Sequence, residues 1–203
     1  MFKGEIMMTD KIPEIVSETF EKLLDLGHNG NKLFTVCLGL TWKVEGENLT
    51  FTKGIVYSPP SIGYVYVAEK ENKSQIIYIG ETGKAFGRFE MVQSTEVNFG
   101  NRERITNKRI KFSILKLLNN EFTVKVYFFI PRYTEVGDFY ITIPSTQIET
   151  KLLGLYKENH QNKENHQKKP FINNFSLPIE EDYETKWEKK VNEFIGSAKC
   201  LKT

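Results

Sequence analysis

The first third of the chain changes from a helical spacing of hydrophobic residues to two runs with strand character. Apolar residues recur at helical spacing over 13–26, which predicts a helix. Two segments rich in β-forming residues follow, at 33–44 and 49–58. Gly46 and Asn48 lie in the break between them, so the pair is predicted to form a hairpin. This part of the chain is therefore expected to be α+β.

The rest of the chain begins with another strand pair. Strands are predicted at 63–69 and 75–81, separated by a polar turn. The elements expected after them are a helix at 84–93, a basic helix at 102–118, a strand at 121–131, and helices at 145–159 and 180–196. Together these segments predict an α/β (α+β) fold, in which a small mixed or antiparallel sheet is flanked by helices.

A length of 203 residues suits one compact domain with extensions. We place the core at 61–178, because a pair of prolines separates it from the hairpin before it. Residues 1–60 are expected to pack on that core as an extension, and 179–203 to add a C-terminal helix.

The composition favours a soluble protein of the cytoplasm. The chain is 39% hydrophobic, enough for a core, but no apolar run approaches the ~18 residues of a membrane helix. The N-terminal residues lack the apolar stretch and cleavage site of a secretory signal. Cys37 and Cys200 lack metal-ligand spacing and fit a reducing compartment, although a disulfide between them stays open.

Charge is distributed unevenly along the chain. The net charge is +2, yet residues 61–178 carry 17 Lys and Arg against 12 Asp and Glu. A basic segment attracts polyanions such as DNA, although many proteins without a nucleic-acid role show a similar excess.

A polar hexapeptide occurs twice in tandem, as KENHQN at 157–162 and KENHQK at 163–168. Its histidines, His160 and His166, could suggest a metal site. A duplication in a solvated extension of the preceding helix is the better interpretation.

An ordered set of residues carries the candidate chemistry. The segments GYVYV and IIYIG are two strands that each present a tyrosine, Tyr66 in the first and Tyr78 in the second. Arg88 follows ten residues after Tyr78 on a predicted helix, and Glu149 lies on a later helix. The sequence PFIN, which ends at Asn173, closes the set. From about 63 to 174 this order resembles the GIY-YIG nuclease family.

The resemblance implies a role for each of these side chains. Tyr66 would take or relay the proton of the attacking water, and Tyr78 would orient water or phosphate. Arg88 would bind the scissile phosphate through its planar fork. Glu149 would bind Mg²⁺ (or Mn²⁺), which prefers carboxylate ligands, and Asn173 would hydrogen-bond within the site.

Two glycines are expected to shape the site. Gly63 takes the place of the first-motif glycine, displaced by one residue, and Gly80 would allow a tight turn between strand and helix.

Local sequence offers competing interpretations. Tyr64 and Tyr66 share one strand face, so both could be ordinary sheet residues. Thr146 to Glu149 has the form of a capping box, in which Glu149 would bond the Thr146 backbone N–H. Arg88 could be a surface cation, and no polar partner for it is evident close after it on the same helix.

A basic stretch follows the arginine helix, in a region from 95 to 120 that we interpret as an insertion. Phosphate contacts and a solvated helix face are equally good explanations of its charges. The residues that we predict to bind DNA are Lys84, Arg102, Arg104, Lys108, Arg109 and Lys111.

These observations predict a metal-dependent DNA endonuclease of the restriction type, since the resembling segment lacks an added zinc finger or helix-turn-helix. A mobile-element or repair nuclease of the same family is the alternative within the enzyme class. A DNA-binding protein that kept the fold but lost catalysis is the alternative outside it. DNA is the expected partner, and a homodimer would allow both strands to be cut together.

Overall fold

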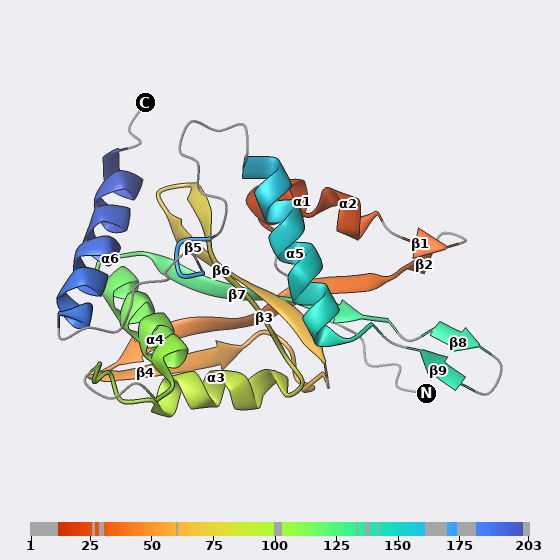
Figure 1. Ribbon diagram of the computed structural model, residues 1–203, viewed down its shortest axis with the longest axis horizontal. Helices are drawn as coiled ribbons and strands as arrows, with labels where there is room; N and C mark the ends of the chain where they lie inside the picture. Colours follow the sequence, from red (N-terminus) through yellow and green to blue (C-terminus); the bar gives the residue numbers. More distant parts are fainter. Residues whose placement is uncertain are drawn as a thin grey trace.

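The computed structural model is organised around one five-stranded antiparallel sheet with helices on both faces (Figure 1). This arrangement confirms the predicted α+β fold class. The structure describes residues 12–25, 27–28, 31–59, 61–99, 103–132, 134–136, 139–141, 143–160, 170–173 and 182–200.

Every pair of neighbouring strands in the main sheet is antiparallel. In spatial order the strands are β4 (Asn48–Lys53), β3 (Phe34–Glu45), β7 (Thr123–Pro131), β5 (Ile62–Lys70) and β6 (Lys73–Thr82). Two short pairs lie outside it: β1 (Gly27–His28) with β2 (Asn31–Lys32), and β8 (Thr134–Val136) with β9 (Phe139–Ile141). The predicted hairpin at 33–58 thus supplies two strands of the same sheet as the tyrosine strands. The sheet therefore continues across the boundary that we placed at residue 60.

The helices agree closely with the hydrophobic spacing. They are α1 (Glu14–Thr19), α2 (Glu21–Leu24), α3 (Ala85–Ser94), α4 (Ile105–Leu118), α5 (Ser145–His160) and α6 (Tyr183–Cys200). The helix predicted over 13–26 is interrupted at Phe20, where φ is −116° and ψ is 18°. The Phe20 ring is buried edge-on against Phe129, with ring centroids 5.2 Å apart, and this packing outweighs local helical preference. In the described part of the chain, no helix has the length and apolarity to cross a bilayer.

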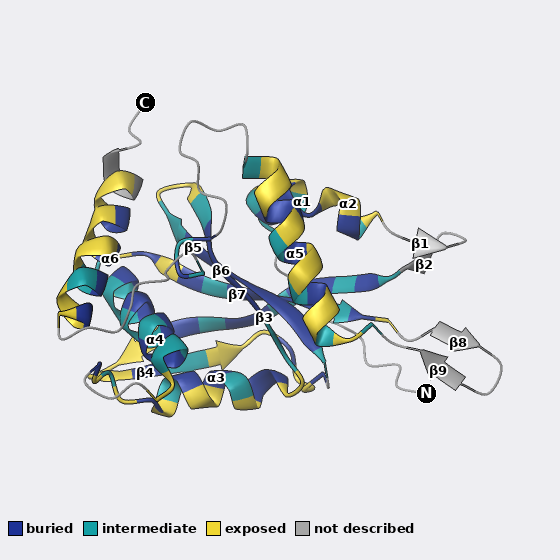
Figure 2. Ribbon diagram, viewed as in Figure 1, coloured by how far each residue is buried: buried dark blue, intermediate teal, exposed yellow. Residues whose placement is uncertain are grey.

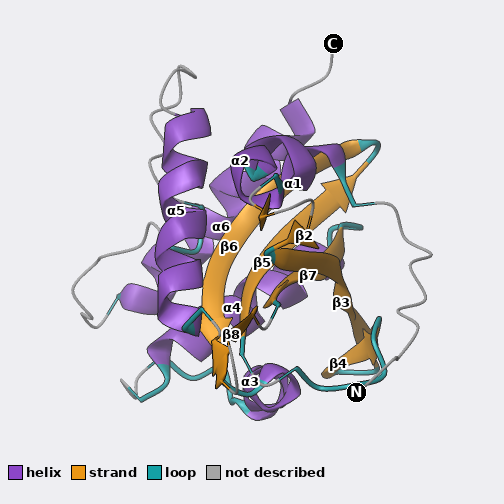
Figure 3. Ribbon diagram, turned by 90° about the vertical axis from the view of Figure 1, so that its right-hand side faces the viewer, coloured by secondary structure: helices purple, strands orange, loops and turns teal. Residues whose placement is uncertain are grey.

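Each face of the sheet has its own hydrophobic core, because side chains alternate along a strand. Val65, Val67 and Ile79 face α1, α2 and α5. Tyr64 and Tyr66 face the opposite core, to which α3, α4 and α6 contribute. Figure 2 shows buried residues on the strands and on the inner sides of these helices. Figure 3 shows α5 running alongside β6, which is an edge strand.

A β-bulge interrupts the pairing of the two tyrosine strands. Tyr66 pairs with Tyr78, but the next residue, Val67, pairs with Ile76, so Ile77 is an extra residue in β6. As a result, Ile77 and Tyr78 both contribute to the core that contains Tyr64 and Tyr66. Bulges bend a strand and re-aim its side chains, and this one lies directly beside Tyr78.

Candidate active site at the sheet edge

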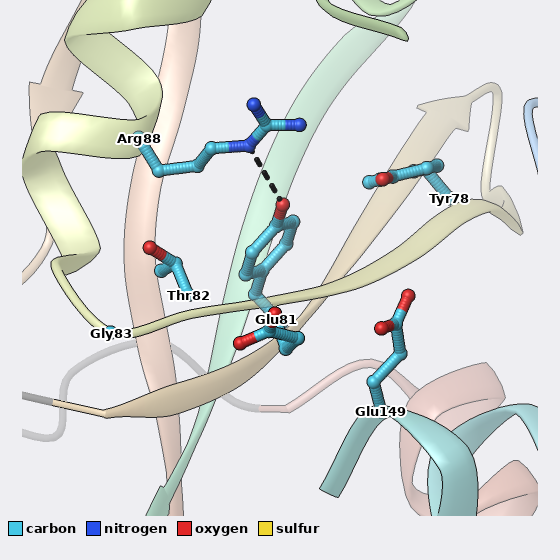
Figure 4. Close-up of a pocket in the computed structure, with 7 residues that line it drawn as sticks. Tyr78, Glu81, Thr82, Gly83, Arg88 and Glu149 are labelled. Carbon is cyan, nitrogen blue, oxygen red and sulfur yellow. Dashed lines mark hydrogen bonds between the residues drawn. The ribbon is translucent and has the colours of Figure 1, made fainter. Parts of the chain in front are cut away.

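A polar pocket of about 360 Å³ opens at the end of β6 (Figure 4). It is lined by Tyr64, Tyr78, Glu81, Thr82, Gly83, Arg88 and Glu149. Three residues that the sequence predicted are therefore brought together: Tyr78 and Arg88, and Glu149, which is distant from both in the chain.

The pocket draws on both layers of helices. Arg88 lies on α3, against one face of the sheet, and Glu149 lies on α5, against the other. Because β6 is the edge strand, no further strand separates the two layers there, and both side chains reach the same space. Tyr64 comes from β5, the neighbouring strand.

The Arg88 guanidinium is held from two directions. Its Nε donates to the Tyr64 hydroxyl at 3.3 Å, the bond dashed in Figure 4. Its Nη1 donates to Oδ1 of Asn107, a buried residue of α4. Burial by itself lowers the pKa of Arg88, but the neighbouring Tyr64 and Tyr78 raise it by more. The net shift of the pKa is therefore upward, and the guanidinium stays charged.

The turn into α3 is closed by Thr82. Its hydroxyl accepts from the Lys84 backbone N–H at 3.1 Å and lies 3.2 Å from the Lys84 carbonyl, to which it donates. This local bonding fixes the start of the helix that presents Arg88, four residues later. Lys84 itself is exposed and directly follows Gly83, which lines the pocket.

Gly80 has a different role from the one predicted. It lies inside β6 rather than in a turn, and among the described glycines only Gly46 has a positive φ. A Cβ at Gly80 would lie 2.7 Å from the hydroxyl oxygen of Tyr64. The absence of a side chain therefore allows the Tyr64 ring to cross over β6 and reach Arg88.

The tyrosine that reaches the pocket from β5 is Tyr64, not the predicted Tyr66. Tyr66 is enclosed by the rings of Tyr64, Tyr78 and Phe89, at centroid distances of 5.8, 5.6 and 6.2 Å. Both β5 tyrosines point to the same face, as expected, but only Tyr64, which pairs with Gly80, lines the pocket.

Burial strengthens the preference of these phenols for the neutral form. It raises the pKa of Tyr64 and of Tyr66, and it raises the pKa of Tyr78 against the opposing effect of the Arg88 charge. The Tyr64 hydroxyl accepts a hydrogen bond from Arg88 and also interacts with the Tyr78 hydroxyl, which links the two phenols of the pocket.

The capping-box interpretation of Glu149 does not fit the helix start. α5 begins at Ser145, and the backbone N–H groups of Gln147 and Ile148 donate to the Pro144 carbonyl. Thr146 is thus inside the helix and is not its N-cap. Glu149, on the first turns of the helix, points into the pocket with Glu81 nearby (Figure 4).

Glu81 is a site residue that the sequence analysis missed. It directly follows the YIG tripeptide, and this position at the strand end was the available signal. Burial raises the pKa of Glu149, and the nearby Glu81 carboxylate raises it further, while Arg88 opposes both. Two carboxylates that repel each other would be stabilised by a shared cation.

These carboxylates fit the implied metal ion. Among the described residues, no cluster of three or more His, Cys, Asp or Glu side chains is placed so that it could hold a metal ion. Mg²⁺ does not require one, because proteins commonly hold it with one or two carboxylates while water and substrate phosphates complete its shell. Glu149 and Glu81 supply that donor set.

Gly63 brings α5 close to the sheet. A Cβ at this position would lie 2.5 Å from Cγ2 of Ile148 and 2.9 Å from Cδ1 of Leu152. Because Ile148 immediately precedes Glu149, the missing side chain helps to set the depth of the carboxylate in the pocket.

Asn173 supports the site from behind. Its side-chain Oδ1 accepts from the Ile79 N–H at 2.8 Å, and its Nδ2 donates to the Ile79 carbonyl at 2.7 Å. Asn173 does not line the pocket, so it acts on the strand between Tyr78 and Gly80. The stacking of Phe171 on Trp187 of α6, at 5.3 Å, holds this turn in place.

The described cations of the basic stretch do not form one continuous exposed row. Lys108 is buried, Arg109 lies over the Trp187 ring, and Lys111 donates to the Gln93 carbonyl at 2.7 Å. Lys108 nevertheless lines a second pocket together with Arg104, and Arg109 and Lys111 are half-buried where α4 meets α6 and α3. Arg104 is exposed, and Arg102 lies outside the described residues.

Neither His160 of the hexapeptide repeat nor Cys37 lines the pocket. The first histidine of the repeat, His160, ends α5 with its ring stacked on Tyr156 at 4.0 Å, while His166 lies outside the described residues. Cys37 is a free thiol in the core, and burial raises its pKa to about 11.

Comparison with family models, curated proteins and solved structures finds no match to this chain.

Proposed function

We propose that this protein is a metal-dependent endonuclease that hydrolyses phosphodiester bonds of DNA, as its resemblance to the GIY-YIG nucleases implies. The observation that carries the proposal is the meeting of Arg88, Tyr64, Tyr78 and Glu149 in one polar pocket at a sheet edge. A cation and two carboxylates surrounded by phenols suit a phosphodiester better than an apolar ligand.

Each group has a task in this proposal. Arg88 binds the scissile phosphate and stabilises the charge that builds up on it during attack. The Tyr64 hydroxyl passes a proton between water and phosphate as a neutral relay, and Tyr78 orients the phosphate. Glu149, with Glu81, would hold Mg²⁺ or Mn²⁺, which supplies Lewis-acid stabilisation of the phosphate and leaving oxygen.

The alternative of a DNA-binding protein without turnover rested on the lack of a polar partner for Arg88 on its own helix. Asn107 provides such a partner from another helix, and this supports the proposal of catalysis.

Incubation with plasmid and phage DNA tests the proposal directly, in Mg²⁺ and in EDTA. Discrete fragments in Mg²⁺ would identify a restriction-type enzyme, and a smear would indicate a nonspecific or repair nuclease. A gel shift without cutting would leave a binding protein and contradict the proposal. Sedimentation with and without DNA would establish whether a homodimer forms.

Two variants of α5 make this assay specific. Glu149→Gln should abolish cleavage while DNA binding persists. Glu158→Gln is the matched control, since Glu158 lies on the same helix in an exposed ion pair with Lys22 at 3.0 Å. Equal cleavage by both variants would exclude Glu149 from the reaction.

A further inference from the structure

The first turn of α4 contains a buried polar residue that packing alone does not explain. Asn107 is only 2% exposed, and asparagine is a poor helix former. Buried polar groups are nearly always hydrogen-bonded, and the Asn107 carbonyl oxygen accepts from Arg88 of the candidate active site.

The contact from Asn107 completes the orientation of the guanidinium. Tyr64 holds Nε and Asn107 holds Nη1, and these two points fix both the direction and the plane of the group. The guanidinium fixed in this way belongs to a residue that lines the pocket, where Tyr78 also interacts with it. A guanidinium whose plane is fixed loses less entropy when it binds a phosphate.

α4 is itself fastened to α3, the helix that carries Arg88. Lys111, four residues after Asn107, donates to the carbonyl of Gln93 in the last turn of α3. Lys116 further along α4 forms an ion pair with Glu188 of α6 at 2.5 Å. Asn107 is therefore presented to Arg88 from a helix that is anchored on both sides.

We propose that Asn107 is a positioning residue, which holds the Arg88 guanidinium in the plane needed to bind a phosphate. The inserted helix α4 then serves the active site through its buried face rather than through its charges. This inference rests on the proposed phosphodiesterase function, but the contact itself can be tested without it.

The decisive variant is Asn107→Leu, which keeps a side chain of similar size and removes the acceptor. The single-turnover cleavage rate at saturating enzyme should fall roughly 10–100-fold, while the DNA dissociation constant stays within a few-fold. Ser113→Ala is the matched control, because Ser113 is fully buried on the same helix and its hydroxyl has no hydrogen-bond partner. It should leave the rate unchanged.

A double-mutant cycle separates positioning from general destabilisation. In an Arg88→Lys background, Asn107→Leu should cost little more, because the group that it positions is already gone. An equal loss in both backgrounds, or no loss in the wild-type background, would overturn the proposal.

Nitrogen NMR of the Arg88 side chain tests the contact independently of cleavage. Hindered rotation should give two resolved terminal nitrogen signals in the wild type and in Asn107→Asp, which keeps an acceptor, and one averaged signal in Asn107→Leu.

If the wild type cuts no DNA but shows this pattern, the proposed function fails and the positioning contact stands. Averaged signals in the wild type would refute the contact itself. If the Leu variant does not fold, Asn107→Ser, which is too short to reach Arg88, takes its place.

Discussion

The Tyr64 hydroxyl lies over Gly80, at a position where a Cβ on residue 80 would come within 2.7 Å of it. Gly80→Ala should therefore displace the Tyr64 ring and destabilise the protein by about 1–3 kcal/mol, as overpacking commonly does. Cleavage should fall more than stability alone explains, because Arg88 loses a partner. Gly154→Ala is the control, since nothing lies within 4 Å of a Cβ there and alanine favours the helix. Denaturant unfolding with single-turnover cleavage measures both effects. An unchanged cleavage rate in Gly80→Ala would show that the Tyr64 position is unimportant.

The two β5 tyrosines form a matched pair, because both are buried and face the same core. Tyr64→Phe should slow cleavage strongly, since it removes the only β5 hydroxyl in the pocket lining. Tyr66→Phe should leave the cleavage rate within a few-fold of the wild type. The reverse outcome would restore the assignment of Tyr66 that the sequence predicted.

Arg88→Lys should fail to support cleavage although it keeps the positive charge. A lysine ammonium cannot contact Tyr64, Asn107 and a phosphate in one plane as the guanidinium does. The expected loss in the single-turnover rate is on the order of 10²–10³. A lysine variant with near wild-type rate would mean that Arg88 acts only as a steering charge.

The raised pKa of Glu149 gives stability and activity opposite dependences on pH. A carboxyl whose pKa is higher in the folded state binds its proton more tightly there, so stability decreases as pH rises through the window above its ordinary value of 4.5. Glu149→Gln should therefore unfold at an equal or higher temperature than the wild type at pH 7, and this difference should shrink at acid pH. The cleavage rate should instead rise with pH through the same window, because the ionised carboxylate is the metal ligand.

Mg²⁺ provides a second readout in the same melting experiments. It should raise the melting temperature of the wild type, since it relieves the repulsion between Glu149 and Glu81. It should have much less effect on Glu149→Gln. A Mg²⁺ shift of equal size in both proteins would place the ion elsewhere.

The cations of α4 should separate into structural and DNA-contacting groups. Lys111→Met removes the bond to the Gln93 carbonyl and should cost about 1–2 kcal/mol of stability, with no change in the salt dependence of DNA binding. Arg104→Ala, at an exposed site, should leave stability unchanged and reduce the slope of log affinity against log salt by about 0.9 if it touches a phosphate. A reduced slope in the Lys111 variant would contradict the interior role.

The main strands and most of the helices followed from the hydrophobic spacing, because these segments are regular and strongly patterned. The interruption at Phe20 did not, since it depends on packing against Phe129, which is distant in sequence. Short irregular pairs such as β1 with β2 likewise have no periodic signal.

The site could be predicted only in part. Tyr78, Arg88 and Glu149 were found because their order along the chain resembles a family. The choice between Tyr64 and Tyr66 could not be made from periodicity, because both lie on one face and the difference depends on the space above Gly80. Asn107 was not identified at all, because its significance is a contact with another helix.

The hydrogen bonds between Asn173 and Ile79 have a consequence for the protein in solution. An edge strand normally exposes unpaired N–H and C=O groups, which can recruit a strand from another molecule. At Ile79 both groups are satisfied by one side-chain amide, and the Ile77 carbonyl accepts from the Ile172 backbone N–H at 2.8 Å. The turn at 170–173 thus occupies backbone groups of β6 through which a strand of another molecule could otherwise pair. It does so without lining the pocket at the end of β6.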